Sequence, residues 1–369
     1  MMMRNITITY DDCILQVTAI GDEAHLMLHA GGTLTFQQQL DALHAAWASF
    51  RETHALEYSS VFMRYFLSDA ANQTAALDAC ISGNQVCAVS VVEQPPLDGS
   101  KVALWVYMMK NVEVTRAEGG LWKVIQGSYR HFWMGNSFCR EGDSCQQMRS
   151  LLENYDDALS ANGCRLADDC IRTWIYVQNV DVNYSGVVRG RKEVFDQAGL
   201  TKETHYIAST GIAGRNAYAD SSVILDAYAV DGLDKCKVRH LYAPSHLNPT
   251  YEYGVTFERG TAVDYPDRRQ VFISGTASID NRGQIVHPGD VRKQTERLLE
   301  NVSVLLEEAQ CSYDDVMSMI VYLRDISDLK AVREIFEARF PEMPMVFLWA
   351  PVCRPGWLVE MECIALNII

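Results

Sequence analysis

The chain has 369 residues, of which 48% are hydrophobic and 21% charged, a composition typical of a globular protein rather than a disordered one. Its 32 lysines and arginines against 47 aspartates and glutamates give a net charge of -15, which repels a phosphate backbone at long range. These values argue against a dedicated nucleic-acid binder, and the length suits two or three domains.

No stretch reaches the roughly 18 uninterrupted apolar residues that a membrane-spanning helix needs, so no membrane association is predicted. Residues 1–10 lack a charged segment followed by an apolar run, so we expect no secretory signal and a cytoplasmic protein. The eleven cysteines are odd in number and show no C-x-x-C spacing. This pattern predicts free, mostly buried thiols and no metal site.

In chain order, the first predicted helix carries Leu40, Leu43, Trp47 and Phe50 at helical spacing. A β-rich run containing Tyr65 follows. After a second helix, the segment ends in a strand that begins at Val102.

A second segment repeats this order with a stronger helix signal. Gly142-Asp143 precedes a helix in which Asp143 is the predicted N-cap, because its carboxylate can accept hydrogen bonds from free backbone N–H groups. The apolar face of this helix consists of Met148, Leu151, Leu152, Tyr155, Ala158 and Leu159. A β-rich run with Tyr176 and a final strand from Val223 complete the segment.

The third segment repeats the second at a constant offset of 147 residues at the start of the helix, where Gly289-Asp290 matches Gly142-Asp143. Its helix has an apolar face of Leu298, Leu299, Val302, Leu305, Leu306 and Ala309. A strand with Tyr322 and a final strand, 359–364, follow.

Three copies of one module are therefore predicted. The order strand, strand, helix, strand, helix, strand, strand predicts a mixed sheet with both helices on one face. We place the modules at 1–115, 128–232 and 266–369, with an aromatic, turn-rich linker at 233–265. From the separation between the tyrosine strand and the last strand in each copy, Ala103 and Ile224 are expected to occupy the position of Glu360.

The third module resembles the YjgF/Rid superfamily in four places: 271–278, Gly289-Asp290, 314–325 and 358–365. That resemblance implies an α/β (α+β), chorismate mutase-like fold that forms trimers with ligand pockets between subunits. Three fused modules would then form an intramolecular pseudo-trimer, either monomeric or a low-order homo-oligomer.

The resemblance also implies, for the ordinary Rid deaminases, an arginine that holds the substrate carboxylate. In this sequence the corresponding places hold Met345, Ser209 and, approximately, Cys87. None of the three modules keeps that arginine, which argues against simple Rid activity.

A narrower resemblance, to the FkbO-type chorismatases, covers about residues 130–369. It is carried by 172–176, 189–195, 208–212, 253–259, 274–278 and 352–360. It implies an enzyme that removes pyruvate from chorismate or a related enolpyruvyl carboxylate, giving a hydroxybenzoate or a dihydroxycyclohexadienoate without a metal or organic cofactor. The expected partner is thus a small anionic carboxylate.

Glu360 is the candidate general acid, and Glu362 lies on the same face of the predicted strand. If Glu360 faces a closed pocket, desolvation raises its pKa and allows it to donate a proton near neutral pH. The alternative is an exposed strand face with two solvated carboxylates. Cys353 is the second catalytic candidate, since the sequence here resembles the chorismatases that form 3-hydroxybenzoate; its alternative is a buried, small apolar residue.

The resemblance implies arginines for the two substrate carboxylates, because a guanidinium binds a carboxylate in bidentate fashion. The candidates are Arg172, Arg189 or Arg191, and Arg339, each of which has the alternative of a surface ion pair. The other candidate binding residues are Ser274, Gly275, Ala277 and Tyr253. Gly275 could also mark a strand bulge, and Tyr253 could pack between modules.

Two other functions stay open: a Rid-type enamine or imine deaminase, and a small-molecule-binding protein without catalysis. In each case one pocket is expected, at the seam between the middle and last modules, because the other two modules lack a carboxylate at the Glu360 position.

Overall fold

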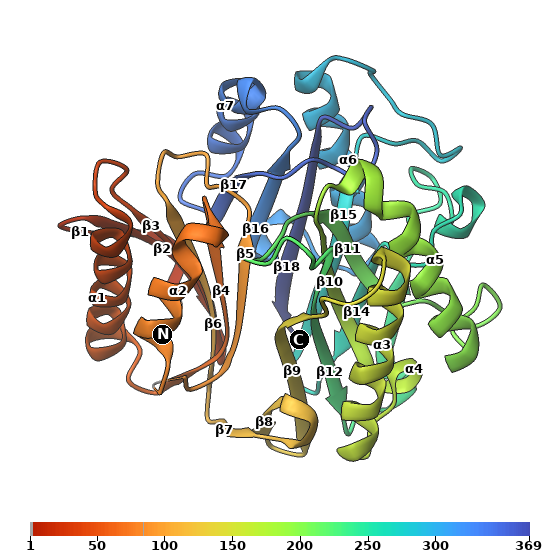
Figure 1. The fold of residues 1–369 in the computed structure, drawn as a ribbon, viewed down its shortest axis with the longest axis horizontal. Coiled ribbons are helices and arrows are strands. Elements are labelled where there is room, and N and C mark those ends of the chain that lie inside the picture. Colours follow the sequence, from red (N-terminus) through yellow and green to blue (C-terminus); the bar gives the residue numbers. More distant parts are fainter. Residues whose placement is uncertain (1–2, 84) are drawn as a thin grey trace.

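The computed structural model describes residues 3–83 and 85–369, and its elements fall into three sets of eight in the same order (Figure 1). The first set is β1 (Met3–Tyr10), β2 (Cys13–Ile20), β3 (Glu23–Ala30), α1 (Phe36–His54), β4 (Tyr58–Leu67), α2 (Ala70–Ile81), β5 (Ala88–Glu93) and β6 (Val102–Lys110).

The second set is β7 (Glu113–Arg116), β8 (Trp122–Gln126), β9 (Tyr129–Phe138), α3 (Ser144–Ala161), β10 (Cys170–Val177), α5 (Val180–Ala198), β11 (Ala208–Ala213) and β12 (Val223–Asp231), with the short α4 (Leu166–Asp169) before β10. The third set is β13 (Val238–Leu241), β14 (Gly260–Asp264), β15 (Arg268–Ala277), α6 (Val291–Glu308), β16 (Val316–Leu323), α7 (Leu329–Arg339), β17 (Met345–Trp349) and β18 (Val359–Ile368). Below, these sets are the first, second and third module.

Each module forms one six-stranded mixed sheet with the same strand order: β1-β2-β3-β6-β4-β5, β7-β8-β9-β12-β10-β11 and β13-β14-β15-β18-β16-β17. The pair β4 and β5, and its counterparts in the other sheets, is parallel, whereas the other pairs are antiparallel. The predicted fold of three tandem modules is confirmed. Each module has three strands before its first long helix, one more than predicted.

Residues 233–265 were predicted as a linker, and that prediction is wrong. They contain β13 and β14, which form the outer edge of the third sheet. In the same way β7 and β8 belong to the second sheet rather than to a connection after the first. The reason is length: a strand of four or five residues places only two or three side chains on each face, too few to produce a recognisable alternation.

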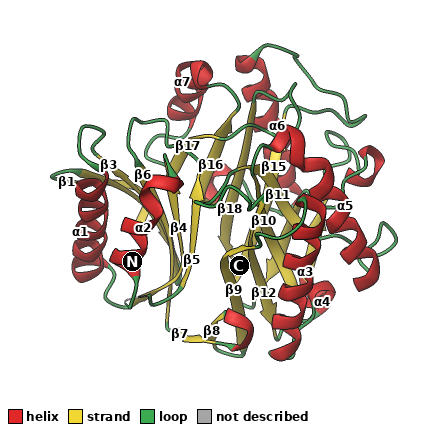
Figure 2. Cartoon of the chain, viewed as in Figure 1, coloured by secondary structure: helices red, strands yellow, loops and turns green. Residues whose placement is uncertain are grey.

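The long helices lie on the outer face of each sheet, with the strands toward the middle of the molecule (Figure 2). The helix-side core of the first module includes Leu40, Leu43 and Phe50 from α1, and that of the second includes Leu151, Leu152 and Tyr155 from α3. These are the residues whose spacing predicted the helices. The opposite faces of the three sheets meet in one central core.

Three buried ion pairs connect the modules in a cycle, each arginine reaching a carboxylate of a neighbouring module. Arg64 of the first module lies 3.0 Å from Asp226 of the second, Arg172 of the second 2.8 Å from Glu362 of the third, and Arg268 of the third 2.6 Å from Glu23 of the first. Removing one partner of such a pair leaves an uncompensated buried charge, which is strongly destabilising. The pairs therefore favour one arrangement of the modules over others.

The strand register corrects one predicted equivalence. Tyr176 pairs with Ile224 and Tyr322 with Glu360, but Ala103 pairs with Phe66, so Phe66 rather than Tyr65 is the counterpart of the two tyrosines. Because side chains alternate along a strand, this one-residue difference turns Tyr65 toward the helix face. There its hydroxyl lies 2.9 Å from Nε2 of His44.

Among the helices of residues 3–83 and 85–369, none has the length and apolar character required to cross a membrane.

Candidate active site

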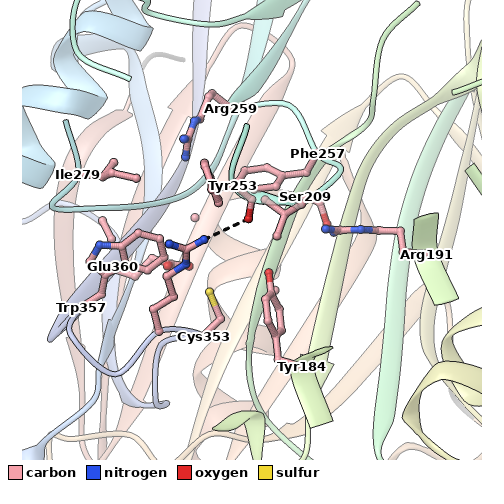
Figure 3. Close-up of a pocket in the computed structure, with 15 residues that line it drawn as sticks. Tyr184, Arg191, Ser209, Tyr253, Phe257, Arg259, Ile279, Cys353, Trp357 and Glu360 are labelled. Carbon is pink, nitrogen blue, oxygen red and sulfur yellow. Dashed lines mark hydrogen bonds between the residues drawn. The ribbon is translucent and has the colours of Figure 1, made fainter. Parts of the chain in front are cut away.

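A pocket lies at the seam between the second and third modules (Figure 3). The second module contributes side chains from α5 and β11, and the third contributes β15, the start of β18 and the loop between β17 and β18. The segment before β14 crosses the pocket. Its lining comprises Tyr184, Arg191, Ser209, Gly211, Tyr253, Val255, Phe257, Arg259, Gly275, Ala277, Ile279, Cys353, Arg354, Trp357 and Glu360.

Glu360 is inside this pocket and is only 4% exposed. A Cβ on Gly275 would lie 2.1 Å from Oε1 of Glu360, so the carboxyl group occupies space that only glycine leaves free. The register of β15 shifts between Ile273 and Thr276, so Gly275 also lies at a strand irregularity, as its alternative interpretation proposed. Glu362 is equally buried, and neither carboxyl lies on an exposed strand face.

Burial, with the nearby carboxylate of Glu362 as the second cause, raises the pKa of Glu360 to about 8. At neutral pH the side chain is therefore mostly a neutral carboxylic acid. No side-chain hydrogen bond to Glu360 exists among the described residues, which leaves its proton available to a bound molecule.

The structure separates the four candidate arginines. Arg191 lines the pocket from α5 and is 2% exposed, whereas Arg189, two residues away, points from the same helix toward Sγ of Cys145 at its surface. Arg339 lies in the last turn of α7, 3.7 Å from Glu296, because that helix covers the outer face of the sheet. Arg189 and Arg339 are thus not brought to the pocket.

Arg172 lies behind the pocket rather than in it. Its guanidinium donates to Glu362 at 2.8 Å and to the hydroxyl of Ser274 at 3.2 Å, and it also contacts Thr210. Ser274 in turn donates to the carbonyl of Glu258 at 2.6 Å. Arg172 and Ser274 therefore support the wall of the pocket, while Gly275, Ala277 and Tyr253 line it.

Two lining arginines, Arg259 and Arg354, were missed as binding candidates although both lie in segments that carry the chorismatase resemblance. Arg259 donates to the backbone carbonyl of Asn248 at 3.1 Å and lies 5.4 Å from the ring centre of Tyr253. Arg354 donates to the carbonyl of Tyr253 at 3.4 Å. Sequence alone could not choose them, because which arginines converge depends on how the 253–259 segment crosses the seam.

None of Arg191, Arg259 and Arg354 has a carboxylate within 4 Å among the residues that the structure describes. Arg191 donates to the hydroxyl of Thr256 at 3.2 Å, and one of its terminal nitrogens has no partner in the described part of the chain. A buried guanidinium without a counter-ion is unfavourable unless a ligand supplies the charge. The pocket thus has the electrostatics of an anion-binding site.

Cys353 lies in the pocket beside Tyr184 and Glu360 (Figure 3). Desolvation, with Glu360 as the second cause, raises the pKa of the Cys353 thiol to about 12. The group is therefore a neutral thiol at physiological pH and not a thiolate nucleophile.

The position of the Rid arginine can now be read from the strand pairing. Met345 faces Met319 and Ser209 faces Thr173, and in the first module Val89 faces Met63, so Val89 rather than Cys87 is the counterpart. Ser209 lines the pocket and has no charge.

At the two other seams, protein contacts fill the positions that correspond to this pocket. Between the first and second modules a Cβ on Gly135 would lie 2.5 Å from the carbonyl oxygen of Val89, so the backbones are in direct contact. Between the third and first modules His29 lies opposite Ala103 and contacts Asp98 at 2.8 Å and the carbonyl of Met345 at 3.1 Å. Within residues 3–83 and 85–369, no group of three or more histidines, cysteines or carboxylates is placed to hold a metal ion.

Comparison with known proteins agrees with this geometry. A family model described as Endoribonuclease L-PSP matches residues 261–367. A RutC family protein of Pyrococcus abyssi is 38% identical over 98 residues, which are 26% of this chain and 76% of that protein. The chain belongs to the YjgF/Rid superfamily.

Two further likenesses extend beyond the third module. A 3-hydroxybenzoate synthase of Streptomyces hygroscopicus is 28% identical over 221 residues, which are 52% of this chain and 62% of that protein. The crystal structure of a chorismatase matches 83% of this chain and 93% of its own, with a TM-score of 0.66 and 21% identity. The three-module chain therefore has a chorismatase-like fold, and the relatives it matches include enzymes.

Proposed function

We propose that this protein is a chorismatase-like enzyme that removes pyruvate from chorismate or a related enolpyruvyl carboxylate. One observation carries the proposal: a protonated carboxylic acid, Glu360, lies in a pocket with three guanidinium groups that have no carboxylate partners among the described residues. The chemistry of this substrate class needs both features, a proton donor and cations for two carboxylates.

A bound dianionic substrate would supply the carboxylates that the lining arginines lack. Chorismate carries one carboxylate on its ring and a second on its enolpyruvyl ether, and Arg191 and Arg259 lie on different elements, in α5 and before β14. Two separate cations suit two separate carboxylates. Arg354 provides a third donor beside the aromatic rings of Tyr253 and Trp357.

The reaction begins with transfer of the Glu360 proton to the vinyl methylene carbon of the enol ether. The π electrons of the double bond form the new C–H bond, which leaves a cationic ether carbon and an ionised Glu360. A water molecule then adds to that carbon and gives up one proton to the Glu360 carboxylate, which regenerates the acid. The resulting hemiketal collapses, the ether C–O bond breaks, the ring oxygen takes up a proton and pyruvate leaves.

Cys353 beside Glu360 supports a hydroxybenzoate as the product, because the sequence around it resembles the chorismatases that form 3-hydroxybenzoate. This assignment agrees with the name of the 3-hydroxybenzoate synthase that matches 52% of this chain. The loss of water needed to make the ring aromatic would take place in the same pocket, out of contact with bulk solvent.

The proposal predicts that the purified protein releases pyruvate from chorismate without an added metal or cofactor. Pyruvate is followed with lactate dehydrogenase and NADH, and liquid chromatography separates a hydroxybenzoate from a dihydrodiol. Heat-inactivated protein is the control for spontaneous decay of chorismate. A rate no higher than that control would contradict the proposal.

A second candidate is a Rid-type enamine or imine deaminase, because a 3-aminoacrylate deaminase of Acinetobacter baylyi is 31% identical over 97 residues. The uncharged Ser209 and Met345 at the position of the Rid arginine argue against it. Faster loss of iminopyruvate with the protein than without it, together with no pyruvate from chorismate, would favour this candidate. Binding of chorismate without either reaction would favour a non-catalytic protein.

A further inference from the structure

The second buried carboxylate of β18, Glu362, is held in place by hydrogen-bond donors of the protein itself. Its carboxylate accepts hydrogen bonds from Nε1 of Trp174 at 2.8 Å and from Arg172 at 2.8 Å, and also from the hydroxyl of Thr210. Arg64 adds a contact at 4.0 Å. In all these contacts the Glu362 carboxyl oxygens are acceptors, and one of the donors is a guanidinium.

This fixed charge is coupled to Glu360 by position. Residues two apart on a strand place their side chains on the same face, and Glu360 and Glu362 are both 4% exposed on that face. Contact continues through the neighbouring strands: Thr210, which donates to Glu362, accepts the backbone N–H of Gly275 at 2.8 Å. Gly275 is the residue against which the Glu360 carboxyl packs.

The other titratable groups around Glu360 are cationic or neutral. The cations are Arg191 from α5, Arg259 from the segment before β14 and Arg354 from the loop before β18, which line the pocket, and Arg172 from β10, which lies behind its wall. The titratable neutral groups are Cys353 from that loop, Tyr184 from α5 and Tyr253 from the crossing segment, and Tyr322 of β16 pairs with Glu360. Of these cations, Arg259 and Arg172 favour an ionised Glu360, and Glu362 is the one anion that opposes them among the described lining and strand neighbours.

We propose that Glu362 is a positioning residue: its buried, Arg172-paired carboxylate keeps Glu360 protonated and seated against Gly275, ready to act as the acid. The inference rests on the proposed function, since only then is Glu360 the catalytic acid. The ionisation of Glu360 can nevertheless be measured without any substrate. Arg172 accordingly serves Glu362 and does not bind substrate.

Replacing Glu362 by glutamine removes the negative charge and leaves Arg172 uncompensated, and both changes favour the ionised form of Glu360. The midpoint of Glu360 ionisation should fall by about one pH unit or more. It can be measured without substrate as the infrared carbonyl band of the protonated carboxyl group, identified as the band that Glu360→Gln lacks. In the pyruvate assay the alkaline limb of the pH profile should move down by the same amount.

The chain supplies a control in Glu23, which is likewise a buried carboxylate paired with an arginine, Arg268, but lies at another seam. Glu23→Gln should leave the Glu360 midpoint unchanged, although it removes a comparable buried charge. An equal shift in Glu23→Gln and Glu362→Gln, or no shift in Glu362→Gln, overturns the inference.

A second variant keeps the test decisive if Glu362→Gln does not fold. Arg172→Met removes a cation near Glu360 and should raise the midpoint, the opposite direction, and an unmoved midpoint there also overturns the inference. The two proposals fail separately. A wild-type protein with shifted midpoints in the variants but no pyruvate release refutes the proposed function alone, and pyruvate release with unmoved midpoints refutes the role of Glu362 alone.

Discussion

Glu360→Gln is expected to lower the rate of pyruvate release by about 10²- to 10⁴-fold, the range typical for loss of a general acid. Glutamine has nearly the same shape but no transferable acidic proton. Because the Glu360 side chain makes no hydrogen bond among the described residues, the substitution breaks no hydrogen bond of the folded protein. Circular dichroism should therefore match the wild type, and thermal unfolding should match it at about pH 4.5 and below, where Glu360 is protonated in the folded protein.

The pH dependence gives an independent check of the same role. With a pKa of about 8, Glu360 is protonated below that pH, so activity should fall as the pH rises through about 8. The folded pKa lies above the ordinary value of 4.5, so unfolding releases a proton between these two values. The wild type should therefore lose stability relative to Glu360→Gln as the pH rises from about 4.5 to 8.

The control for this experiment is Glu337→Gln, which removes one carboxylate from the exposed side of α7. It should keep full activity and the wild-type pH profile. Full activity in Glu360→Gln would show that another group protonates the substrate and would remove the basis of the proposed mechanism.

Arg191→Met is expected to act in opposite directions on catalysis and stability. The lost cation should lower kcat/KM for chorismate by about 10²-fold or more, mainly through KM, because one substrate carboxylate would lie in a buried pocket without its partner. The free protein, by contrast, no longer buries a guanidinium without a carboxylate. Its free energy of unfolding should rise by roughly 1–2 kcal/mol.

Arg189→Met is the matched control, since Arg189 lies two residues away on the same helix but on its surface. Both its kinetics and its urea-unfolding curve should stay close to those of the wild type. If Arg191→Met instead destabilises the protein and leaves KM unchanged, Arg191 is a structural residue and the substrate carboxylate is bound elsewhere.

The fold could be predicted from sequence to the extent that each module contains long elements. The apolar faces of α3 and α6 and the strand that ends in Glu360 are strongly periodic, because a long amphipathic element must bury one face. The edge strand β13 and its neighbour β14 have four and five residues, so their alternation was too short to recognise and they were assigned to a linker. The equivalence of Tyr65 failed by one residue for a related reason, since register depends on pairing with another strand.

For the candidate site, the sequence by itself was enough to choose the acid and the neighbouring residues that the third module contributes to the pocket. Glu360, Cys353, Gly275 and Ala277 are close along the chain or on adjacent strands of one module, so local pattern and family resemblance were enough to choose them. Only the tertiary structure decided which cations join them. Arg191, Arg259 and Arg354 come from different segments, and the packing of the second module on the third brings them together while it leaves Arg189 and Arg339 at the surface and commits Arg172 to Glu362. The physical reason is that the sequence determines where an arginine lies along the chain and that it carries a positive charge. Which anion that charge meets depends on which parts of the folded chain pack against it.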